Sequence, residues 1–175
     1  IAAENSLPGD LLYPVKVKVN EEVKALFSFS SKAKADTAIN RAEERLLEAE
    51  KLALKGELTA EVAANIESNF EKQMVEAYDH LATLRGDEKF TVASDENAKL
   101  QATLKAHSKI LVDLGENKSD KKDKDVVESL LNLNAKVTIN LDAAENDQEK
   151  TESDLSTKVE VQADVQASAE GKMKA

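Results

Sequence analysis

Apolar residues recur at alternating intervals of three and four along most of this chain, which is the spacing of helices that each bury one face. The clearest such stripe is a heptad seam: Ala35, Ile39, Ala42, Leu46, Ala49 and Ala53. Ser30 before it and Gly56 after it suit the two ends of a helix. The small alanines allow a second helix to pack closely over residues 31–55. Charged positions off the seam, among them Arg45 and Glu48, are expected to form a solvated face.

Glycine and proline are rare, with five and two residues, and both prolines precede residue 15. Long helices with short connections are typical of this composition. Four further helices are expected from similar stripes: residues 14–29; 60–85 after a cap at Thr59; a helix from a cap at Ser94 or Asp95 to a stop at Gly115; and one from about Asp125 onward.

These elements predict an all-α fold, an up-and-down antiparallel bundle of about five helices over residues 1–144. No repeat of fixed period is visible, which argues against a solenoid. Beyond Glu145 large apolar residues become sparse, and the alternation from Val159 to Val165 has the period of a strand. The Ala, Glu, Gln and Lys content favours a helix instead. A long, poorly anchored C-terminal helix is therefore expected for residues 145–175, with disorder as the second interpretation and a strand as the third.

Charge and composition exclude several classes of function. The net charge of −10 disfavours nucleic acid and anionic membrane surfaces as partners. The absence of cysteine excludes disulfides, thiolate metal sites and cysteine nucleophiles. No run of about 18 apolar residues is present, so no membrane span is expected in the given chain.

The residues that carry chemistry form no recognisable catalytic or metal motif. His80 and His107 fall on different predicted helices, and Glu76 stands four rather than three residues before His80, unlike a di-iron motif. The aspartates of the charged linker, Asp120, Asp123 and Asp125, alternate with lysines that oppose cation binding. No enzyme activity, metal or cofactor is predicted.

The opening segment is the one dense run of turn-forming and large apolar residues. Pro8 and Gly9 suit the central positions of a type II turn, and Pro14 suits the first turn of a helix. The structural motif consists of Leu7, Pro8, Gly9, Asp10, Leu12, Tyr13 and Pro14. We expect the turn to place Leu11, Leu12 and Tyr13 over the end of the bundle.

Residues Leu7–Lys16 resemble the LPGD-x-LYPVK signature of an uncharacterised family of exported bacterial proteins, and the resemblance covers about residues 4–85. It implies an extracytoplasmic, all-helical domain of unknown function and supplies no catalytic residues. The start at Ile1 rather than Met fits either a removed signal peptide or the boundary of an expressed fragment.

Two functions remain open. The first is an exported, non-enzymatic protein that acts through contact with a protein partner or by self-assembly, at the cell envelope or outside the cell. The alternative is an envelope domain that senses a small ligand or metal, in a groove lined by Tyr78, His80 or His107.

Overall fold

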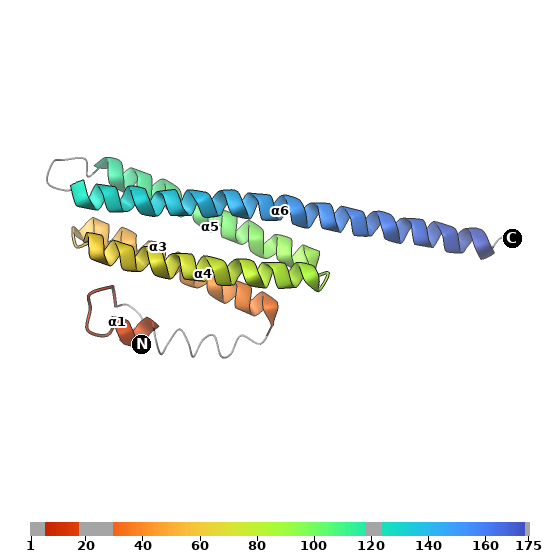
Figure 1. The fold of residues 1–175 in the computed structure, drawn as a ribbon, viewed down its shortest axis with the longest axis horizontal. Coiled ribbons are helices and arrows are strands. Elements are labelled where there is room, and N and C mark those ends of the chain that lie inside the picture. The colour runs from red at the N-terminus through yellow and green to blue at the C-terminus, as the bar shows by residue number, and fades with distance from the viewer. Residues whose placement is uncertain (1–5, 18–29, 118–123, 174–175) are drawn as a thin grey trace.

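The structure, a computed structural model, describes residues 6–17, 30–117 and 124–173. Every regular element in these ranges is a helix, which confirms the all-α prediction (Figure 1). The helices are α1 (Tyr13–Val15), α3 (Ser31–Lys55), α4 (Ala60–Gly86), α5 (Phe90–Asn117) and α6 (Lys124–Met173). Most of the helix predicted over residues 14–29 falls at positions 18–29, outside the described residues. None of the helices described is both long and apolar enough to cross a bilayer.

The bundle is built from two antiparallel hairpins, α3 with α4 and α5 with α6, packed against each other (Figure 1). Ion pairs join the hairpins side by side: Lys32 of α3 meets Glu96 of α5, and Arg85 of α4 meets Asp147 of α6. Helices α3 and α5 run in the same direction, and so do α4 and α6. The predicted antiparallel bundle is therefore confirmed within each hairpin, while contacts between the hairpins join parallel neighbours.

The core consists mainly of small and aliphatic side chains, as the composition predicts. All six residues of the alanine-rich seam on α3 are buried. Facing side chains of α4, including Phe70, Met74 and Leu81, are buried as well. The seam is thus covered by the chain's own helices.

Buried positions on α3 recur on α5 at a constant spacing of 62 residues. The buried pairs are Ala38 and Leu100, Ala42 and Leu104, Arg45 and His107, and Ala49 and Leu111. Helices α3 and α5 therefore share one pattern of burial although their residue types differ, and this spacing does not extend to the buried positions of α4 and α6.

The predicted caps are correct for two helices and wrong for a third. Ser30 Oγ accepts a hydrogen bond from Ala33 N–H (3.1 Å), and Thr59 Oγ1 accepts one from Val62 N–H (3.3 Å). Helix α5 begins at Phe90, before the expected cap at Ser94 or Asp95, and continues past Gly115 to Asn117. Ala93 is fully buried and extends the apolar face toward the N-terminus, while the Ser94 hydroxyl accepts a hydrogen bond from Gln148 of α6 instead of capping (2.7 Å).

Helix α6 continues without interruption from Lys124 to Met173, a length of 50 residues. The first interpretation of the C-terminal segment is therefore correct through Met173, and a strand does not form there. Its buried side chains, among them Leu130, Ala144 and Thr151, face the other helices. From Val159 to Ser168 every side chain is exposed, and this part of the helix projects beyond the bundle (Figure 1). We call residues 159–173 the α6 extension.

Glu88, in the turn between the hairpins, adopts the left-handed backbone conformation with φ 60°. Glu88 N–H bonds to Arg85 O (2.8 Å) and Lys89 N–H to Leu84 O (2.9 Å), which is the Schellman pattern that normally uses glycine. A side chain in this conformation costs about 1–2 kcal/mol. We expect Glu88→Gly to raise the free energy of unfolding by about 1 kcal/mol, measured by urea denaturation.

Two comparisons isolate the backbone effect. Glu88→Ala also removes the exposed ion pair with Lys158, but it keeps a β-carbon in the left-handed conformation and should bring no gain. Gly56→Ala, in the equivalent turn after α3 (φ 72°), should destabilise by about 1 kcal/mol, because a β-carbon there would meet nothing within 4 Å and adds only strain. Equal stability of the Gly and Ala variants at position 88 would show that the turn is unstrained.

Candidate functional site

The opening motif forms the predicted turn. Asp10 N–H bonds to Leu7 O (2.9 Å), and Gly9 between them has φ 103°, as a type II turn requires at that position. The Asp10 carboxylate closes the turn by accepting a hydrogen bond from Leu7 N–H (2.7 Å). A second turn follows, from Tyr13 N–H to Asp10 O (3.1 Å), and leads into α1 with Pro14 in its first turn.

The predicted apolar anchoring of this turn is correct for Leu7 and wrong for Leu11 and Leu12. Leu11 is 95% exposed and Leu12 41%, whereas Leu7 is the leucine that is buried, at 8%. Leu11 lies within the second turn, Asp10–Tyr13, where its side chain is left in solvent. The turn also lies along the flank of α3, where Tyr13 and Lys16 contact Glu48, rather than over the bundle end. Polar groups, together with the single buried leucine Leu7, attach the motif.

Glu48 of α3 is the centre of this attachment. Its carboxylate accepts hydrogen bonds from Lys16 Nζ (2.6 Å) and the Tyr13 hydroxyl (3.0 Å), and it lies 3.3 Å from Arg45 Nη2. Arg45 Nη1 in turn donates to the Tyr13 hydroxyl (2.8 Å). Arg45 and Glu48 are 1% and 2% exposed, so the prediction of a solvated face is wrong at these positions because the opening motif covers them. We call Tyr13, Lys16, Arg45 and Glu48 the Glu48 cluster.

The two cations of the Glu48 cluster are balanced by Glu48 together with Glu44, whose carboxylate lies 3.4 Å from Arg45 Nη2 and 4.0 Å from Lys16 Nζ. A small cavity of about 180 Å³ beside it is lined by two lysines and two glutamates, Lys16, Lys51, Glu44 and Glu48. Opposite charges in equal number leave no excess that would select a charged ligand. The cluster is therefore a structural attachment between the motif and α3.

The histidines and Tyr78 of the alternative function do not line a common groove. His107 is buried between α5 and α3, where Nδ1 lies 2.6 Å from Glu50 Oε1. The Tyr78 hydroxyl donates to the Asn140 carbonyl of α6 (2.5 Å), and His80 is half-buried on α4. Within the described ranges, no group of three His, Cys, Asp or Glu residues is arranged to hold a metal ion. Asp120 and Asp123 lie outside those ranges.

Tyr78 provides a test of the contact between the hairpins. Burial raises the pKa of its hydroxyl, and Asp147 adds to the shift. Because the raised pKa favours the neutral phenol in the folded state, this stabilisation is complete below pH 10 and is lost as the pH rises through the folded-state pKa. In a Tyr13→Phe variant Tyr78 is the only tyrosine. Its phenolate absorbance should then appear together with the loss of helical circular dichroism, whereas phenolate formation in a fully helical protein would contradict the burial.

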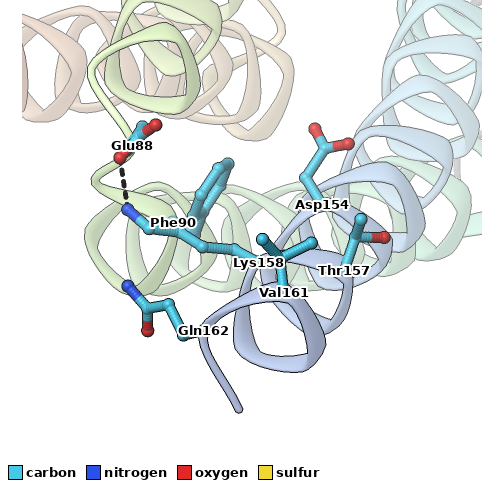
Figure 2. Close-up of a pocket in the computed structure, with 7 residues that line it drawn as sticks. All are labelled: Glu88, Phe90, Asp154, Thr157, Lys158, Val161 and Gln162. Carbon is cyan, nitrogen blue, oxygen red and sulfur yellow. Dashed lines mark hydrogen bonds and ion pairs between the residues drawn. The ribbon is translucent and has the colours of Figure 1, made fainter. Parts of the chain in front are cut away.

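A second candidate region lies where α6 leaves the bundle. An open groove of about 440 Å³ is formed there by the turn between the hairpins, the start of α5 and the underside of α6. Figure 2 shows the Lys158 side chain running from α6 past the Phe90 ring to Glu88, with Val161 beside it. The Lys158 ammonium lies 5.7 Å from the Phe90 ring centre, within the range of a cation–π contact. Sequence reasoning identified the valines of this region but not Phe90, because Phe90 precedes the expected start of its helix.

Comparison with known proteins identifies a family whose function is unknown. Residues 5–172 match the sequence model of a family described as a domain of unknown function, DUF5667. No curated protein and no solved structure matches the chain. The family match extends through α5 and most of α6, well beyond residues 4–85, where the motif resemblance was expected to end.

Proposed function

Because the chain belongs to the DUF5667 family, whose function is unknown, we propose from its structure that it is an exported, non-enzymatic helical protein that acts through protein–protein contact or self-assembly, at the cell envelope or outside the cell. The α6 extension is the observation that carries this proposal. It projects from the bundle and exposes Val159, Val161 and Val165, which are 56%, 57% and 64% exposed.

No packing supports the exposed part of α6, so its helical state there depends on local preference alone. Valine is a weaker helix former than alanine or leucine. Docking of the valines against another protein would stabilise the extension. The alanine-rich seam of α3 offers no alternative contact surface, because the chain's own helices cover it.

Internal pairing of the polar groups supports a non-enzymatic role. The groups most often used in catalysis are held by structural partners: His107 by Glu50, and Tyr78 by a backbone carbonyl of α6. Export is proposed from the resemblance carried by the opening motif. Fractionation of the producing cell, with the protein found in the envelope or medium rather than the cytoplasm, tests that part.

A variant truncated after Lys158 tests whether the α6 extension makes the proposed protein–protein contact. The bundle should unfold at the same urea concentration with or without the extension, because the side chains from Val159 to Ser168 are exposed. In native gels of the envelope or medium fraction, the full chain should migrate in a larger complex and the shortened chain as a monomer. Migration of both as monomers would refute the proposal. A purified full chain that stays monomeric at high concentration by light scattering would remove self-assembly and leave contact with a different protein.

A further inference from the structure

The face of α6 that packs into the bundle continues beyond the bundle's end. Two rows of positions seven residues apart run along this face of α6, which is the repeat of a continuous helical seam. One row contains Ala144, Thr151, Lys158 and Val165, and the other contains Asp147, Asp154 and Val161. Ala144 and Thr151 are fully buried, whereas Val161 and Val165 are exposed. The extension therefore presents a seam of the same register with no helix packed against it.

Phe90 and Val161 provide the apolar surface at the near end of this seam. They line the open groove together with the stem of Lys158, whose ammonium is held by Glu88 (Figure 2). The groove lies in line with the exposed valines of α6 and beside the turn where α4 ends and α5 begins. A partner helix lying along the extension would place its end in this groove.

The charges around the seam select the chemistry of the partner. Asp154 lines the groove, and Asp164, one turn beyond Val161, borders the seam on one side, whereas Glu160 lies on the far side of the helix. No lysine or arginine occurs from residue 159 to 168, and the ammonium of Lys158 is already paired with Glu88. An apolar strip with one carboxylate at its near end and another along one side is complementary to a helix that carries apolar residues on one face and basic residues beside them.

We propose that the α6 extension and the Phe90 groove bind a basic amphipathic helix of another protein. This inference rests on the proposed function and names the class of partner. A second copy of the chain fits less well, because each copy has a net charge of −10 and would bring the same acidic border to the contact.

A labelled synthetic peptide serves as the probe. It is a helix of about 18 residues, or five turns, with leucines at i, i+3, i+4 and i+7 and lysines at the flanking positions. The control peptide has the same composition, reordered so that its leucines share no face. Fluorescence anisotropy with the full chain should show at least tenfold tighter binding of the amphipathic peptide, and affinity should fall as salt rises.

Substitutions separate apolar docking from simple charge attraction. Val165→Asp makes the seam more acidic, so a purely electrostatic contact would bind the basic peptide more tightly. We expect it to bind at least tenfold more weakly, because the central apolar contact is lost. Val159→Asp is the matched control, since Val159 lies about 100° around the helix from Lys158 and off the seam. It should leave the affinity within about twofold of the wild type.

The possible results distinguish this inference from the function on which it rests. Equal binding of the two peptides, or unchanged binding by Val165→Asp, would overturn the basic-helix inference. Dimers that Val165→Asp dissociates in sedimentation velocity would show that a second copy is the occupant, which also overturns it while supporting the proposed function. If the peptides do not bind and the chain shortened at Lys158 migrates like the full chain in cell fractions, both fail.

Discussion

Glu48→Ala should lower the free energy of unfolding by about 3–5 kcal/mol, the usual cost of leaving a buried charge without its partner. Arg45 and Lys16 would both lose their nearest carboxylate, and the one that remains beside them, Glu44, is partly exposed. Arg45 is almost completely buried, so water cannot replace that carboxylate without opening the structure. For a chain of this size the midpoint of thermal unfolding should fall by about 2–4 °C for each kcal/mol. Urea denaturation followed by circular dichroism measures the change directly.

Two further substitutions identify what attaches the opening motif. Glu48→Gln keeps the shape and an acceptor oxygen but removes the charge, and should destabilise less than Glu48→Ala. Leu11→Ala should change stability by no more than about 0.5 kcal/mol, because that side chain is exposed. A large loss from Leu11→Ala, combined with a small loss from Glu48→Ala, would show that the leucines anchor the motif after all.

The helices themselves were predictable because their causes are local. A seam of apolar residues needs a period of 3.6, and Ser30, Thr59 and Gly56 satisfy the backbone groups at helix ends through neighbours a few positions away. The wrong prediction for the start of α5 came from relying on the same local signals. Ser94 is a good capping residue in isolation, but its hydroxyl binds Gln148, which is distant in sequence. The contact between α5 and α6 therefore overrides the local capping preference of Ser94.

The burial of Arg45 and Glu48 could not be predicted in that way. On an isolated α3 both would face water, and only the return of the opening motif onto this helix covers them. Leu11 shows the opposite error, since a large apolar side chain at the tip of a turn has no neighbour to bury it. Sequence spacing identified the turn from Leu7 to Asp10, but the partner of the turn depends on contacts more than thirty residues away.

The shared pattern of burial on α3 and α5 could not be predicted from sequence for a related reason. The repeat is one of position rather than residue type: Ala42 corresponds to Leu104, and Arg45 corresponds to His107. A search for recurring residues finds nothing, whereas burial makes the spacing visible. The proposed contact surface was partly predictable, because the scarcity of large apolar residues beyond Glu145 indicates a poorly anchored helix. The groove at Phe90 was not predictable, because it depends on where the first hairpin ends.

His107→Leu should destabilise the bundle by about 3–5 kcal/mol, because it leaves the Glu50 carboxylate buried without a hydrogen-bond donor. The two side chains are each 5% exposed and join α5 to α3 across the contact between the hairpins. An ionised carboxylate only accepts hydrogen bonds, so the tautomer of His107 with its proton on Nδ1 is the one that pairs with ionised Glu50. Urea denaturation of the variant measures the loss, and hydrogen exchange should show it at the facing segments of α3 and α5.

The double variant Glu50→Met/His107→Leu is the decisive control for this pair. It replaces both polar groups with apolar side chains of similar size, so no charge is left buried, and stability should return to within about 1 kcal/mol of the wild type. Glu50→Met alone leaves a neutral imidazole without its acceptor and should cost less than His107→Leu, about 1–3 kcal/mol. If the double variant is as unstable as His107→Leu, the cost comes from packing around the imidazole and not from the unpaired carboxylate. Recovery in the double variant would show that the pair adds little net stability, because the cost of removing its polar groups from water offsets their attraction.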